Sequence, residues 1–370
     1  MRKLLPALKI AFTLAILAAV GRFFYLDLRR AGSEGLWRHP CWLVLSGAFY
    51  ILGLFCSAWF WIRLMRSLGQ DPSFMPAVRA YYLGHLGKYL PGKAWALVVR
   101  ASLAQGAGVK VGVAGVTSLY EVLTTMSAGA LLAAVLFAVG APDTSSLDDW
   151  SPLRRLFTER DPDTSAVDRK GLVALALGML VVVGVPILPP VFNRLVKRLR
   201  SLKNLLARQP ASESIDPRRF HVRMPVLLEG LAMTAVGWML LGASLWAVLQ
   251  SVADEPRLMT VAEWGQLSAI LSLAYVAGFI VVFMPSGLGV RELFLRLFLV
   301  PELSRQWTGE KLSVTTAIWA VLLLRLVWTA AELVTCAIVY QFPRQAPGDS
   351  RNRNMAKVPE QETTDKTEKN

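Results

Sequence analysis

Long apolar stretches separated by short charged segments make up most of the chain. Seven of them are long enough to cross a bilayer core of about 30 Å, which takes roughly 20 residues in a helix. They lie at Leu8–Leu26, Trp42–Ile62, Gly112–Gly140, Gly171–Phe192, Pro225–Gln250, Gln266–Met284 and Ser313–Gln341. The pattern predicts an all-α polytopic membrane protein with about seven to eight transmembrane helices, in which residues 1–341 form one transmembrane domain.

Two further apolar segments are interrupted by proline, glycine and charge. The first is Ser73–Gln105, broken around Pro91, and the second is Ser286–Val300, which follows Pro285. In hydrocarbon, an interrupted helix persists only where surrounding protein or a water-filled cavity satisfies its backbone. We therefore expect two broken or re-entrant helical segments, each bordering a functional site.

Composition supports a membrane protein and argues against several other classes. Of the 370 residues 54% are hydrophobic and 18% are charged, with a mean hydropathy of +0.44, which is too apolar for an ordinary soluble domain. The formal charge of +14 is explained by basic loops facing anionic lipid, so no nucleic-acid partner is expected. The three cysteines and three histidines are scattered, and we expect neither a metal site nor a cofactor.

We expect a multi-pass protein of the cell membrane, specifically the cell inner membrane, and loop charge predicts its orientation there. The segment Asn193–Arg223 has nine basic and two acidic residues, whereas Ala141–Lys170 has seven acidic and five basic residues. Because Lys and Arg are retained inside, the first segment is expected to be cytoplasmic. The N-terminus is then cytoplasmic if the first broken segment returns to the side that it enters. Its basic start and apolar run lack a cleavage site, which favours an uncleaved span over a signal peptide.

Two polar segments outside the spans, residues 342–370 and Asn193–Arg208, allow further predictions. Residues 342–370 are polar and charged, typical of a disordered tail. Their basic residues favour the cytoplasm, which requires the second broken segment to make a net crossing. Asn193–Arg208 has leucines along one helix face among basic residues. It is either a helix lying on the cytoplasmic leaflet or an ordinary basic connector.

The first break mimics a nucleotide-binding loop. Gly87–Lys93 has the spacing G-x-x-x-x-G-K, but Ala94 stands where Ser or Thr would hold magnesium, and the context is apolar. The glycines are better interpreted as helix breakers. A helix starting after Pro91 presents unpaired N–H groups and a positive dipole end, so we expect this end to attract anions.

The second break repeats the first. Phe283-Met284-Pro285-Ser286 resembles Tyr89-Leu90-Pro91-Gly92, and paired broken helices in two halves of a membrane protein point to a central transport site. Ionisable residues in the spans add to it, and the alternative for them is a structural ion pair. The candidate substrate-binding residues are Lys88, Pro91, Gly92, Lys93, Arg100, Glu121, Pro285, Gly287, Gly289, Arg291, Glu292, Arg325 and Glu332.

These motifs carry a family resemblance over most of residues 1–341. They are Lys88-Tyr89-Leu90-Pro91-Gly92-Lys93 with Trp95 and Arg100, Tyr120-Glu121, Pro285-Ser286-Gly287-Leu288-Gly289-Val290-Arg291-Glu292, and Arg325 with Glu332. The chain resembles the flippase-like membrane family that includes the N-terminal transmembrane region of bacterial lysylphosphatidylglycerol synthases. Many relatives have Gly-Glu after the first proline motif, where this chain has Trp95-Ala96, so a role for that glutamate does not carry over.

The resemblance implies a transporter rather than an enzyme. Its substrate would be an anionic or aminoacylated phospholipid, or a polyprenyl-phosphate-linked lipid, moved between leaflets. One alternative is an integral membrane enzyme acting on a lipid head group, with Glu121 or Glu292 as general base. Another is a non-catalytic partner of a separate membrane-bound glycosyltransferase or lipid synthase.

Overall fold

The computed structural model describes residues 39–89, 95–140, 169–206, 221–253, 255–281, 290–306 and 310–342, and in these ranges all regular structure is helical. The α-helices are α2 (Cys41–Ser67), α3 (Phe74–His85), α4 (Trp95–Leu103), α5 (Val111–Val139), α7 (Arg169–Gly184), α8 (Pro189–Leu206), α9 (Met224–Val252), α10 (Val261–Ile280), α11 (Val290–Gln306) and α12 (Glu310–Tyr340). The 3₁₀ segments are η1 (Leu86–Tyr89), η2 (Ala104–Ala107) and η4 (Val185–Ile187). The prediction of an all-helical protein is confirmed.

Four of these helices, α2, α5, α9 and α12, are long and apolar enough to cross a membrane. A fifth candidate span combines α7 with the start of α8, which meet at a bend of 57°. The predicted span Gly171–Phe192 is therefore not straight, because Pro186 and Pro189 interrupt the backbone hydrogen bonds there. The predicted span Leu8–Leu26 lies outside the described residues. The described ranges thus hold four or five candidate spans, and the total of seven to eight stays a prediction.

Small residues allow helices α2 and α9, which lie side by side over much of their length, to pack closely. A Cβ built on Gly53 would lie 3.1 Å from the backbone oxygen of Gly237, so glycine is needed on both helices. Nearer the start of α2, the hydroxyls of Ser46 and Ser244 are 2.8 Å apart. Close approach of this kind is how membrane helices associate without a hydrophobic driving force between them.

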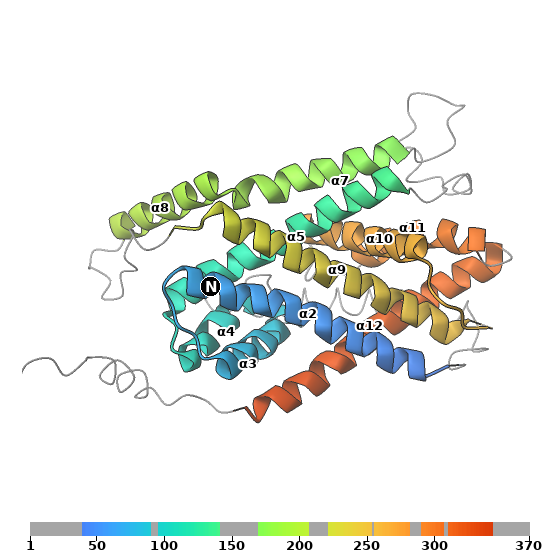
Figure 1. Ribbon diagram of the computed structural model, residues 1–370, viewed down its shortest axis with the longest axis horizontal. Helices are drawn as coiled ribbons and strands as arrows, with labels where there is room; N and C mark the ends of the chain where they lie inside the picture. The colour runs from blue at the N-terminus through green and yellow to red at the C-terminus, as the bar shows by residue number, and fades with distance from the viewer. Residues whose placement is uncertain are drawn as a thin grey trace, which may run out of the picture.

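The first broken segment returns to the end of the molecule from which it starts. We call α3, η1, α4 and η2 the first hairpin. At its base the Ser73 N–H donates to the Ala107 carbonyl at 3.2 Å, and the Lys110 N–H donates to Gln70 Oε1 at 3.2 Å. Figure 1 shows α3 and α4 side by side at the left, where α2 ends and α5 begins. The first broken segment thus returns as expected, while the cytoplasmic N-terminus stays a prediction, because residues 1–38 lie outside the described ranges.

A second hairpin, formed by α10 and α11, starts from the opposite end of the molecule. Near the beginning of α10, Gly265 faces the Leu136 side chain at the end of α5, and α11 ends just before α12 begins. The predicted span Gln266–Met284 overlaps α10, which is not among the four or five candidate spans, and the predicted segment Ser286–Val300 overlaps α11. Helix α12 then runs back toward the end that holds the first hairpin and α8 (Figure 1). The side of the membrane on which the tail lies stays a prediction, because residues 343–370 are outside the described ranges.

Two hydrophobic clusters divide the interior between the hairpins. One surrounds the first hairpin and includes Tyr81, Val113, Phe192 and Val339, and the other surrounds the second hairpin and includes Phe137, Leu249, Leu271, Leu299 and Leu324. Large apolar side chains that remain exposed, such as Val135, Val236 and Ile338, lie on the candidate spans, where lipid replaces water as their solvent.

The basic segment after α7 is confirmed as helical. In α8, Phe192 and Val196 are buried while Arg194, Lys197 and Arg198 are exposed. This is the two-faced arrangement that a helix at a membrane surface requires.

Candidate functional site

The structure describes seven of the thirteen predicted site residues. They are Lys88, Arg100, Glu121, Arg291, Glu292, Arg325 and Glu332. The other six, Pro91, Gly92, Lys93, Pro285, Gly287 and Gly289, lie outside the described residues. The seven form three ion-paired groups, and two of these groups meet at α12.

The first group is centred on Glu332 and is called the Glu332 cluster. The buried carboxylate accepts hydrogen bonds from Lys88, from the Tyr50 hydroxyl, and from the Tyr89 hydroxyl at 2.8 Å. The Lys88 ammonium also lies 3.2 Å from Nε2 of His85. Lys88, Tyr89 and His85 come from the tip of the first hairpin, so this cluster joins that tip to α12 and α2.

The second group is centred on Glu292 and is called the Glu292 cluster. The carboxylate Oε1 accepts from Arg325 at 2.7 Å and from Arg291 at 2.9 Å. The Arg291 guanidinium also lies over the Tyr275 ring, 4.4 Å from its centroid, a favourable cation–π geometry. Arg291 and Glu292 follow the break of the second hairpin, so this cluster joins the second tip to α12.

Arg325 and Glu332 share a helix face, as predicted, but they bind different hairpins. They lie seven residues apart on α12, which is two turns. Arg325 binds Glu292 of the second hairpin, while Glu332 binds Lys88 of the first. Helix α12 therefore connects the two hairpin tips through charged side chains.

Aromatic rings fill the space between the two clusters. Tyr50 stacks on Trp328 with ring centroids 4.3 Å apart, and Trp328 contacts Tyr275 at 5.5 Å. Trp328 in turn donates from its indole N–H to the Ser244 hydroxyl at 2.8 Å. Since the Tyr275 ring also contacts the Arg291 guanidinium, an unbroken row of contacts runs from the Glu332 carboxylate to the Glu292 carboxylate.

The third group, Arg100 with Glu121, is enclosed within the first hairpin and α5. Arg100 donates to Glu121 Oε2 at 2.6 Å, and both side chains are only 3% exposed. The Tyr81 hydroxyl donates to the same carboxylate at 3.1 Å, and the Arg100 guanidinium lies 4.0 Å from the Tyr81 ring centroid. Arg100 can bind another anion only after this pair has opened.

Exposure separates the cations of the Glu332 and Glu292 clusters from their carboxylates. The side chains of Lys88, Arg325 and Arg291 are 32%, 27% and 21% exposed, whereas those of Glu292 and Glu332 are 7% and 2% exposed. In the part of the chain that the structure describes, three cations thus share two carboxylates, with the cations toward the accessible side. The two clusters lie two turns apart on α12 and are joined by the row of aromatic contacts, so they form one site. An anion is the ligand that such a site favours.

Five contributors among the described residues were not in the predicted set. Tyr50, His85, Tyr89, Tyr275 and Trp328 complete the site. Tyr50 and Trp328 lie within apolar spans, where a ring with a polar tip is compatible with either a site or an interfacial anchor. The signal that could have indicated Tyr50 and Tyr275 is a hydroxyl far from either end of a long apolar helix.

Together, the fold and the site define a multi-pass membrane protein in which charged side chains of both hairpins meet on α12, with cations in excess of carboxylates among the described residues. The family model described as the lysylphosphatidylglycerol synthase TM region matches residues 7–302. The chain therefore belongs to this family, as its motifs indicate. A search of curated proteins found no match.

Proposed function

We propose that this protein moves an anionic or aminoacylated phospholipid, or a polyprenyl-phosphate-linked lipid, between the two leaflets. The observation that carries the proposal is the shared positive site, where Lys88, Arg291 and Arg325 outnumber Glu292 and Glu332. Burying charge in a membrane protein is costly and is usually associated with a substrate pathway. Family membership supports the same role but does not identify the lipid.

The arrangement of the breaks supports an anionic head group in particular. Helices α4 and α11 both begin after a break, and a helix N-terminus carries a partial positive charge with free N–H donors. Broken helices from two segments, meeting at a central site, occur in transporters whose substrates bind near the midplane. In this proposal a phosphate binds Lys88 and Arg291 in place of their carboxylate partners.

Transport would then proceed by exchange of ion-pair partners. A phosphate that approaches Lys88 competes with Glu332, and one that approaches Arg291 or Arg325 competes with Glu292. The carboxylates keep the cations paired when no lipid is present, which offsets the cost of a buried unpaired charge. The acyl chains remain in the bilayer while the head group crosses.

Reconstitution into liposomes tests the proposal. Vesicles carry a fluorescent anionic phospholipid or its zwitterionic counterpart, and a membrane-impermeant quencher measures how quickly the inner-leaflet label becomes accessible. Arg291→Ala, Lys88→Gln and Glu292→Gln are each expected to slow exchange of the anionic lipid at least tenfold. Arg63→Ala is the matched control, because Arg63 forms an exposed pair with Glu229 at 2.9 Å on the outside of the helices.

Two results would count against different parts of this proposal. Anionic-lipid exchange that is no faster than in protein-free vesicles would remove transport itself. Exchange that is fast but unchanged in Arg291→Ala and Lys88→Gln would retain transport and remove the residue assignment.

A further inference from the structure

A second cation, Arg79, is buried in the first hairpin away from the three ion-paired groups. It lies on α3 and is 7% exposed. Arg100, Arg291 and Arg325 all bind carboxylates. Among the described residues, by contrast, Arg79 has no carboxylate and no hydrogen-bond acceptor, and its Nε is fully buried without a partner. Buried arginines are normally paired, so this one lacks the partner that its charge requires.

The contact that Arg79 does make leaves its hydrogen-bond donors free. Its guanidinium carbon lies 5.2 Å from the centroid of the Tyr340 ring, at the end of α12. A cation–π contact attracts the charge but uses none of the five N–H donors, whose planar arrangement matches a phosphate or carboxylate.

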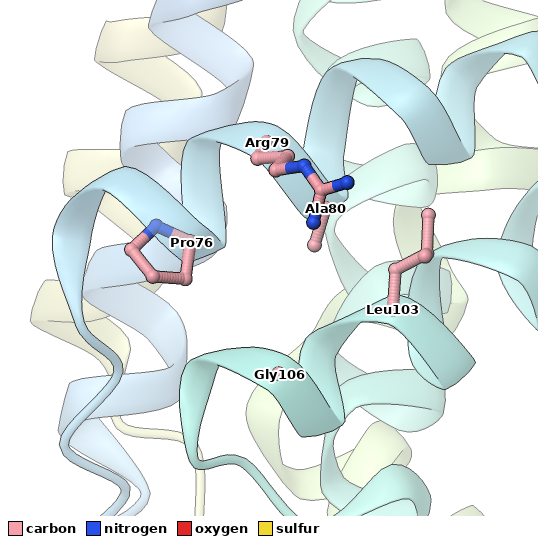
Figure 2. A pocket seen from close by; sticks show the side chains of 5 residues that line it. All are labelled: Pro76, Arg79, Ala80, Leu103 and Gly106. Atoms are coloured by element: carbon pink, nitrogen blue, oxygen red, sulfur yellow. The ribbon is translucent and has the colours of Figure 1, made fainter. Parts of the chain in front are cut away.

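A small, partly open recess lies beside the guanidinium. It is lined by Pro76, Arg79 and Ala80 of α3 together with Leu103 and Gly106. Figure 2 shows the Arg79 side chain reaching into the space between α3 and the α4–η2 turn. A Cβ built on Gly106 would meet nothing within 4 Å, so the space is open on that side. The recess has room for roughly one water-sized atom, so one oxygen of an anionic group could enter it while the rest of the group stays outside.

We propose that this recess is an anion-binding site in which Arg79 binds a phosphate group. It lies near the base of the first hairpin, close to the hydrogen bond between Ser73 and Ala107. This is the end of the molecule that carries α8 and its exposed basic residues (Figure 1). The group can belong to a phospholipid of the adjacent leaflet or to free phosphate, since both present the same oxygens. The site is separate from the lipid pathway proposed above and does not depend on it.

Thermal unfolding of the purified full chain, in micelles free of phosphate and anionic lipid, tests the site. One arm adds inorganic phosphate, and the other adds short-chain phosphatidylglycerol with phosphatidylcholine as the neutral reference. The wild type is expected to show a saturable rise in melting temperature, because a ligand that binds the folded state stabilises it. A rise with phosphate identifies the free ion as sufficient, and a rise with phosphatidylglycerol alone identifies a lipid head group.

Three variants distinguish a binding site from a structural cation. Arg79→Met removes the charge, Gly106→Leu fills the recess while keeping the charge, and Arg66→Gln is a control that removes an exposed arginine near the same end. The first two are expected to lose more than half of the anion-induced rise, and the control to keep it. Without anion, Arg79→Met is expected to melt no lower than the wild type, because it removes an unpaired buried charge. An unchanged rise in Arg79→Met, or no rise in the wild type in either arm, would overturn the proposal.

Discussion

The buried pair between Arg100 and Glu121 gives the sharpest test of the energetics. Removing one partner of a buried ion pair costs roughly 3–5 kcal/mol, since the other charge is left uncompensated. In Glu121→Gln the amide oxygen can still accept one hydrogen bond, and the Tyr81 ring still faces the guanidinium at 4.0 Å. We therefore expect a loss of about 3 kcal/mol, at the lower end of that range.

A double-mutant cycle converts this expectation into a measurement. Arg100→Met with Glu121→Leu replaces the pair with apolar groups of similar size, and such replacements are often neutral. The cycle compares the single variants Arg100→Met and Glu121→Leu, each expected to lose about 3 kcal/mol or more, with the double variant, which is expected to remain within about 2 kcal/mol of the wild type. The coupling between the two sites is then at least ~4 kcal/mol. The assay is unfolding of the purified protein in mixed micelles at increasing denaturing detergent. Stability losses that simply add would refute the reasoning.

The same double variant separates two roles for Arg100. If it is stable and still exchanges anionic lipid in the liposome assay, Arg100 serves to hold α4 against α5. If it is stable and exchange of the anionic lipid is lost, the sequence-based assignment of Arg100 to the head group is supported. Arg100→Met alone does not distinguish these roles, because it leaves Glu121 buried without its partner.

Two further predictions concern packing and capping. Gly230→Ala would place a Cβ 2.3 Å from the Phe60 ring. We expect the forced shift of α9 against α2 to lower the free energy of unfolding by about 1–3 kcal/mol. The same unfolding assay measures this loss, with Gly106→Ala as a control at an open position. Thr260→Ala removes the hydroxyl that accepts from the Glu263 N–H at 3.2 Å in the capping box of α10, and we expect a loss of about 1 kcal/mol. A loss in Gly230→Ala no larger than in Gly106→Ala would contradict the packing argument, and Thr260→Ala as stable as wild type would show that the cap is dispensable.

The helices and their breaks could be predicted because each has a local cause. Apolar length is enough to place α2, α5, α9 and α12, and proline with glycine marks the tip of each hairpin. The bend between α7 and α8 could have been predicted from Pro186 and Pro189, but the apolar run hid it, because hydropathy alone does not register a lost backbone hydrogen bond.

The choice of ion-pair partner could not be predicted from the chain. Spacing places Arg325 and Glu332 on one face of α12, yet each binds a residue far away in sequence, Glu292 or Lys88. Which carboxylate a cation meets depends on how the hairpins approach α12, and this depends on packing across the whole bundle. The same reason accounts for Tyr50, whose hydroxyl reaches Glu332 only because α2 lies beside α12.

Helix α12 supplies an ion-pair partner to each of the two hairpins, so the charges of the two hairpins are coupled through it. When an anion takes Lys88, it releases a carboxylate two turns from Arg325 on the same rigid helix. Under the proposed function, ligand occupancy at one tip therefore alters the affinity of the other, and by thermodynamic reciprocity the influence is equal in both directions. Binding at the first hairpin and binding at the second are in this way linked through one helix.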